Sequence, residues 1–158
     1  MEQVRLTPLP PASKLWEKFE KGDFIDGYAV TSPLSAQEAL QIGLALPSWA
    51  MTLLKIRNRI LSPFGLKTRI DKGYVDSIFP LKFQDEHEVI VGTDDWHQDF
   101  RISVFKFQGT IHMSTWVHRH NLAGYIYLAA VMPFHILIVR DAMRRIAHRT
   151  IAPAAQAQ

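Results

Sequence analysis

Histidine, aspartate and arginine side chains recur at alternate positions in two stretches of strand-like residues. The first stretch carries His97, Asp99 and Arg101, and the second carries His118 and His120. A carboxylate beside a histidine can orient the imidazole for general acid–base catalysis, and an arginine can stabilise developing negative charge. The same groups can also bind the polar part of a ligand. Either chemistry requires the two stretches to lie side by side.

A predicted hairpin brings these residues together. Gln108-Gly109 is typical of a two-residue turn, because glycine readily takes a positive φ angle. The register set by this turn places Asp99 opposite His118 and Arg101 opposite Trp116. A shift of one residue would oppose apolar and polar side chains on both faces of the hairpin, so the pattern favours the first register.

Three interpretations of this polar face remain open. It is the solvated back of a sheet, where cross-strand charge pairs add modest stability. Alternatively, it faces a cavity in which Asp99 orients His118, Arg101 binds an anionic or carbonyl group, and Trp96 and Trp116 form apolar walls.

The third interpretation is a metal site. His97-x-Asp99 and His118-x-His120 would each supply two ligands from one face of a strand. The chain has no recognised long-range ligand motif, so this interpretation is the least favoured. We expect neither a metal nor another cofactor.

A predicted helix from Trp49 to about Ser62 supplies two further candidates for ligand binding. Its apolar residues recur at intervals of three and four, and Arg57 falls in the middle of that stripe. An inward-facing arginine keeps its charge and needs a carboxylate, carbonyl groups, water or an anionic ligand. Trp49 is either a core residue or an apolar wall of the ligand site.

The order of the predicted elements indicates an α+β fold. A short strand over 26–31 precedes a helix that begins at a capping box of Ser35 and Glu38 and runs to about Ala45. After the second helix, strand-like residues occupy 75–83, 88–93, 98–107 and 110–118, and a long helix closes the chain. Strands grouped in this way are typical of an antiparallel sheet covered on one face.

Length and composition bound the function. The 158 residues fit one domain, with a structured core from about 9 to 149 and a frayed tail over 150–158. The absence of cysteine excludes disulfides, thiolate metal sites and cysteine nucleophiles. A net charge of +3 is too small to indicate nucleic-acid binding. The first residues lack the pattern of a secretory signal, so we expect a cytoplasmic protein.

The stretch Leu122–Val139 has two interpretations. It carries no formal charge and is followed by four arginines, which suits a membrane span with a cytoplasmic flank. However, Pro133 and His135 interrupt it, and a helix buried in a curved sheet is also apolar nearly all round. We therefore expect a buried helix rather than a membrane span.

Several short motifs, in this order, resemble the bacterial family called domain of unknown function 2867. They are Pro47-Ser48-Trp49, Leu54-Lys55-Ile56-Arg57-Asn58, Phe64-Gly65-Leu66-Lys67, Phe79-Pro80, the segment 92–101, the segment 120–127 and Pro133-Phe134-His135. The resemblance covers roughly Leu9 to Arg149, and Gln98 stands where the family usually has leucine. That family is similar to the helix-grip superfamily of START domains, polyketide cyclases and birch-pollen-allergen-like proteins. The resemblance implies a curved antiparallel sheet wrapped around a long C-terminal helix, with a ligand cavity between them.

The sequence thus predicts a small domain that holds an apolar or amphipathic molecule in a helix-grip cavity. Its expected contacts are Trp49, Arg57, Trp96, His97, Asp99, Arg101, Trp116 and His118. One alternative is a cyclase- or hydrolase-like enzyme in which Asp99 orients His118 as general base and Arg101 stabilises negative charge. Another alternative is a non-catalytic scaffold or a membrane-associated protein.

Overall fold

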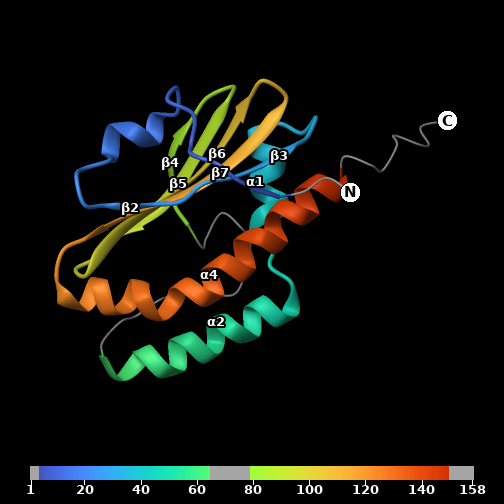
Figure 1. Ribbon diagram of the computed structural model, residues 1–158. Helices are drawn as coiled ribbons and strands as arrows, with labels where there is room; N and C mark the ends of the chain where they lie inside the picture. The colour runs from blue at the N-terminus through green and yellow to red at the C-terminus, as the bar shows by residue number, and fades with distance from the viewer. Residues whose placement is uncertain (1–3, 65–78, 150–158) are drawn as a thin grey trace.

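The computed structural model describes residues 4–64 and 79–149, without the side chains of residues 57, 58, 60, 61 and 64. The expected tail over 150–158 and the part of a predicted strand over 75–78 lie outside these residues. The elements, drawn in Figure 1, are β1 (Arg5–Leu6), η1 (Lys14–Lys18), β2 (Phe24–Ile25), β3 (Tyr28–Thr31), α1 (Ala36–Leu44), α2 (Ser48–Leu61), η2 (Ser62–Phe64), β4 (Leu81–Gln84), β5 (Glu88–Asp94), β6 (Gln98–Phe107), β7 (Thr110–Arg119) and α4 (Leu122–Arg149).

The strands form one curved antiparallel sheet in the order β1-β3-β7-β6-β5-β4, with β2 also paired to β7. Two short helices precede the long run of strands, and the long helix α4 follows it (Figure 1). The predicted α+β fold is therefore confirmed.

The hairpin of β6 and β7 has the predicted register. Asp99 pairs with His118 and Arg101 pairs with Trp116 across the two strands. Gln108 and Gly109 have φ angles of 47° and 74°. Two successive positive φ angles match the right-handed twist of the flanking strands, which is why this turn fixes the register.

The first helix also begins as its sequence indicates. The Ser35 side chain accepts a hydrogen bond from the Glu38 amide, while the Glu38 carboxylate accepts one from the Ser35 amide. This capping box satisfies two amides that the first helical turn leaves without partners.

The helices α1 and α4 cover one face of the sheet. Apolar residues from β3, β5, β6 and β7 pack there against Ala39 and Leu40 of α1 and against Met143 and Ile146 of α4. Met143 and Ile146 are fully buried. The predicted covering of one sheet face by helices is present, and the core fills the layer between them.

The N-terminal segment covers part of the opposite face of the sheet. Leu9 and Leu15 pack there against Ile90, Phe105 and Trp116. Because side chains alternate along a strand, Phe105 shares this face with Asp99 and Arg101, and Trp116 shares it with His118. The expected placing of these polar residues in a cavity beneath α4 is therefore wrong: they lie on the side of the sheet away from that helix.

The long helix α4 is buried along one face only. Gly124, Tyr127, Leu128, Val139 and Met143 are buried, whereas large apolar side chains on the other face are exposed. By length and composition α4 suffices to cross a membrane, and only 22% of its most apolar window is buried. The expectation that Leu122–Val139 is buried nearly all round is therefore wrong.

Candidate functional site

The best-built polar site lies where β7 ends, next to the loop that leads into β2. Asp23, from that loop, accepts a hydrogen bond from His118 Nδ1 at 2.7 Å and from Trp116 Nε1 at 2.8 Å. The Glu20 amide donates to the same carboxylate at 2.9 Å. The Asp23 side chain is only 5% exposed, whereas that of His118 is 34% exposed. A buried carboxylate thus fixes one edge of a histidine whose other edge is open.

The environment of Asp23 keeps this carboxylate ionised. Burial acts to raise its pKa, but the hydrogen bonds from the Glu20 amide, His118 and Trp116 outweigh burial and hold the pKa below its ordinary value. An ionised carboxylate only accepts hydrogen bonds, so His118 Nδ1 carries a proton. In neutral His118, Nε2 is then the basic nitrogen, which is the arrangement that general-base catalysis requires.

Asp99 has a different partner from the one that the sequence predicts. Its carboxylate lies 3.0 Å from His120 Nε2 and accepts a hydrogen bond from the Asp95 amide at 3.3 Å. The expectation that Asp99 orients His118 is therefore wrong, although the two residues are opposed in the hairpin. Asp23 takes that position because its loop crosses the end of β7.

Arg101 is buried, and its charge is already matched within the chain. Its NH2 lies 2.6 Å from Asp94 Oδ1, and its NH1 donates to the carbonyls of Thr93 and Phe100. Burial acts to raise the pKa of Asp94, but Arg101 and Lys82 together lower it below its ordinary value. The guanidinium also lies 5.9 Å from the centre of the Trp116 ring. The expected role of Arg101 in stabilising substrate charge is not supported by this pairing.

His97 is buried against two aromatic rings, one from α4 and one from its own loop. Its ring centre is 4.9 Å from that of Tyr127 and 5.4 Å from that of Trp96. Burial lowers the pKa of His97, and the charge of Asp95, 3.5 Å from Nδ1, only partly opposes this effect. His97 is thus a neutral core histidine at neutral pH.

The three candidate tryptophans do not share one pocket wall. Trp116 is buried beneath the N-terminal segment, whereas Trp49 and Trp96 are exposed large side chains. Arg57 belongs to α2 by its backbone, and its side chain lies outside the described residues. In the part of the chain that the structure describes, no group of three or more His, Asp or Glu residues is placed to hold a metal ion.

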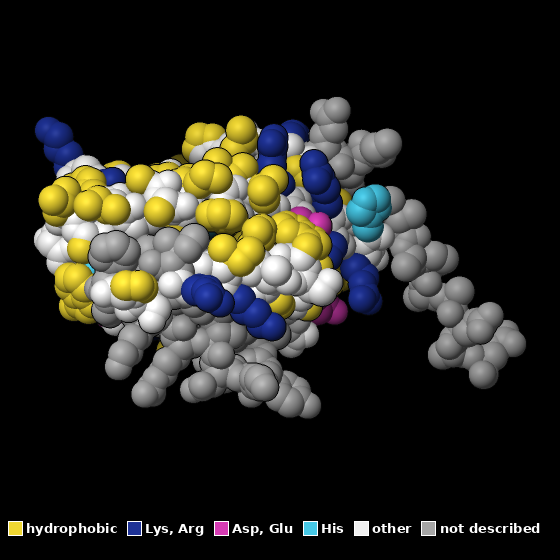
Figure 2. Space-filling view, turned by 90° about the horizontal axis from the view of Figure 1, so that it is seen from below, with side chains coloured by type: hydrophobic (Ala, Val, Ile, Leu, Met, Phe, Trp, Pro, Cys, Tyr) yellow, Lys and Arg dark blue, Asp and Glu magenta, His cyan; other side chains and the backbone are white. Residues whose placement is uncertain are grey.

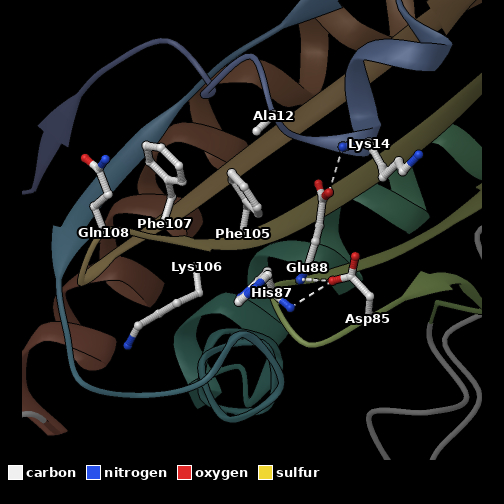
Figure 3. Close-up of a pocket in the computed structure, with 9 residues that line it drawn as sticks. All are labelled: Ala12, Lys14, Asp85, His87, Glu88, Phe105, Lys106, Phe107 and Gln108. Carbon is white, nitrogen blue, oxygen red and sulfur yellow. Dashed lines mark hydrogen bonds between the residues drawn. The ribbon is translucent and has the colours of Figure 1, made fainter.

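A groove that the sequence analysis missed lies on the sheet face that carries Asp99 and His118. It is beside the turns that join β4 to β5 and β6 to β7. It has a volume of about 440 Å³ and, as Figure 3 shows, is lined by Ala12, Lys14, Asp85, His87, Glu88, Phe105, Lys106, Phe107 and Gln108. The rings of Phe105 and Phe107 are stacked with their centres 5.8 Å apart. In Figure 3 the Phe105 ring lies between Phe107 and the Glu88 carboxylate.

Glu88 fixes the N-terminal segment beside this groove. It is 1% exposed and accepts hydrogen bonds from Ser13 Oγ at 2.5 Å, Ser103 Oγ at 2.5 Å and the Lys14 amide at 2.7 Å. The sequence signal for Glu88 is a carboxylate directly before an apolar run, Val89-Ile90-Val91, at the start of β5. That local pattern does not indicate that Ser13 is the partner of Glu88.

A family model described as "Protein of unknown function (DUF2867)" matches residues 19–142. The chain belongs to the DUF2867 family. The match includes Asp23, Glu88 and His118, whereas Ser13 and η1 precede it. No curated protein and no solved structure matches this DUF2867 chain, so its likeness to the helix-grip superfamily stays a prediction.

Proposed function

We propose that this DUF2867 protein binds a small amphipathic molecule in the groove beside Glu88. The observation that supports the proposal is the lining: stacked Phe105 and Phe107 provide an apolar wall, and ionisable residues provide one edge. Binding sites for small molecules are concave, largely apolar and furnished with a few polar groups, and about 440 Å³ falls within their usual size. The ligand class is the one that the sequence predicts, but the proposed site is on the other side of the sheet.

The polar edge of the groove decides how such a molecule would lie. His87 is exposed, and Lys14 is held toward Glu17 by a 2.8 Å ion pair. Lys106 points elsewhere, because its Nζ donates to the carbonyls of Ser32 and Leu34. An apolar ring or chain would therefore lie on the phenylalanines, with the polar end of the ligand toward His87.

Nuclear magnetic resonance with 8-anilinonaphthalene-1-sulfonate as the probe tests this proposal. We expect amide shifts on titration at Lys14, at His87 and Glu88, and along Phe105 to Gln108. Phe107→Ser should weaken these shifts at least tenfold in apparent affinity. Phe19→Ser is the matched control, because Phe19 is 38% exposed and Phe107 is 37% exposed, and Phe19 does not line the groove. Shifts that avoid the groove, or equal effects of the two substitutions, would contradict the proposal.

A second candidate function is acid–base catalysis at His118. The observation that favours it is the buried Asp23 carboxylate, which fixes His118 through Nδ1 and leaves Nε2 without a hydrogen bond to any described residue. Hydrolysis of p-nitrophenyl acetate is a suitable probe reaction. We expect His118→Ala to lower the rate by at least about tenfold, because the substitution removes the candidate general base. The exposed His148→Ala should leave the rate unchanged, and equal rates for both variants would refute the role of His118.

A further inference from the structure

The exposed face of α4 is apolar over its first half and basic over its second half. Leu122, Ile126 and Leu137 are 74%, 61% and 56% exposed, and Tyr125 and Ile136 are exposed beside them. Further along the same helix, Arg140 and Arg144 are exposed. Within each half of the helix these residues recur at intervals of three and four, which places them on the face opposite the buried Gly124 and Ala142. A helix that only covers a protein core would show polar residues there.

Charge is concentrated on the same side of the molecule. The sequences of α2 and α4 contain seven Lys or Arg residues and one Asp, whereas the whole chain has a net charge of only +3. The remaining residues are therefore acidic overall. The single acid, Asp141, is paired with Arg145 at 2.8 Å. Figure 2 looks onto this underside and shows a broad band of hydrophobic side chains with Lys and Arg beside it and little Asp or Glu.

The packing of α4 determines how it can meet an apolar medium. Gly124, near its start, is so close to the sheet that an added Cβ would lie 2.2 Å from the carbonyl oxygen of His97. Met143 and Ile146, near its end, are fully buried in the core. Because α4 is attached to the domain near both of its ends, it cannot span a bilayer while this fold persists. It can lie parallel to a surface.

We propose that the α2–α4 face docks on the surface of an anionic phospholipid bilayer. Leu122, Ile126 and Leu137 would enter the boundary between headgroups and acyl chains, and the arginines would contact the lipid phosphates. Exposed Trp96 and Tyr125, at the same end as Leu122, are side chains that prefer this interface. A second copy of the chain is a poorer occupant, because it would oppose two faces of strongly positive charge. The expected cytoplasmic location agrees with this proposal, since the cytoplasmic leaflet is the anionic one.

Sedimentation with vesicles tests the docking, and it does not depend on the groove. We expect the full chain to bind vesicles of phosphatidylglycerol and phosphatidylcholine at least tenfold more tightly than vesicles of phosphatidylcholine alone, and less tightly as salt is raised. The double variant Ile126→Asn, Leu137→Asn should lose at least tenfold in affinity. Leu6→Asn, Leu81→Asn is the matched control, because those side chains are 69% and 58% exposed on β1 and β4.

A second double variant tests the same docking if the Ile126 and Leu137 variant does not fold. Arg140→Gln, Arg144→Gln should weaken binding to the anionic vesicles, while Lys21→Gln, Lys82→Gln, which removes the same charge elsewhere, should not. Equal binding by the variants and their controls would overturn the proposal. Dimerisation in light scattering that the Ile126 and Leu137 substitutions abolish would assign the face to a second copy. Retention in membranes after a carbonate wash would show a span and would also overturn it.

Discussion

Replacing Asp23 with alanine removes the acceptor that fixes both Trp116 and His118. The carboxylate receives hydrogen bonds of 2.8 Å from Trp116 Nε1, 2.7 Å from His118 Nδ1 and 2.9 Å from the Glu20 amide. Trp116 is a buried core residue, so the loss of the carboxylate leaves its indole N–H without its hydrogen-bond acceptor. Asp23 therefore stabilises the fold as well as orienting the candidate base.

The expected cost follows from these three contacts. A hydrogen bond to a charged group contributes about 1.5–3 kcal/mol, and a buried donor left unpaired costs about 1–3 kcal/mol. The contact with the Glu20 amide is exposed and counts for less. We expect Asp23→Ala to lower the free energy of unfolding by about 3 kcal/mol. Because folding lowers the pKa of Asp23, this difference should shrink as pH falls below about 4, where the unfolded chain takes up the proton more readily.

Asparagine at position 23 makes a sharper test. The Trp116 indole and the Glu20 amide both donate to Oδ2, and a carbonyl oxygen can accept both. The amide nitrogen would then face His118 Nδ1 and donate to it, so the proton of neutral His118 must move to Nε2. We expect Asp23→Asn to cost only about 1 kcal/mol and to invert the tautomer of His118.

Urea denaturation and imidazole nitrogen-15 shifts in mildly alkaline buffer measure these two effects. Glu86→Ala, which removes an exposed carboxylate, is the control and should change the free energy of unfolding by less than about 0.5 kcal/mol. An Asp23→Ala variant as stable as that control would refute the assigned hydrogen bonds. So would a wild-type His118 that already carries its proton on Nε2.

Three further predictions concern the residues around the two sites. Glu88→Ala should lower the free energy of unfolding in urea by about 3 kcal/mol, because Ser13, Ser103 and the Lys14 amide lose a buried acceptor; an effect as small as that of Glu86→Ala would contradict this. Burial lowers the pKa of His97, so the unfolded state binds the proton first and the free energy of unfolding falls as pH drops through about 6.5. His97→Phe should reduce the stability lost between about pH 7.5 and about pH 5.5, and an unchanged loss of stability would contradict this prediction. Gly124→Ala should lower the thermal midpoint through a cost of about 2 kcal/mol, since the added methyl group meets the His97 carbonyl; an unchanged midpoint would show that α4 is less tightly attached.

Local sequence signals predicted the elements that depend on local contacts. The Gln108-Gly109 turn fixes the pairing of β6 with β7, because only one register keeps apolar residues on one face. The capping box at Ser35 likewise marks the start of α1. Each of these signals lies within a few residues of the structure that it specifies.

The partners in the candidate sites could not be predicted in this way. Asp23 is 95 positions away from His118, and Ser13 is 75 positions away from Glu88. Only the path of the N-terminal segment across the sheet brings them together, and no periodicity records that path. Asp99, which the hairpin register made the obvious partner of His118, is instead turned toward the Asp95 amide and His120.

The surface of α4 was mispredicted for a different reason. Its sequence is apolar on both faces from Leu122 to Val139, so no polar stripe marks the solvent side. A uniformly apolar helix predicts burial on both sides, whereas in the structure the domain covers only one side of α4.

A crystallographic screen with small amphipathic fragments tests the proposed binding function most directly. We predict that bound fragments will cluster in the groove, with their apolar parts on Phe105 and Phe107 and their polar ends toward His87. Fragments that bind elsewhere and leave an accessible groove empty would contradict a ligand-binding role for this face of the sheet.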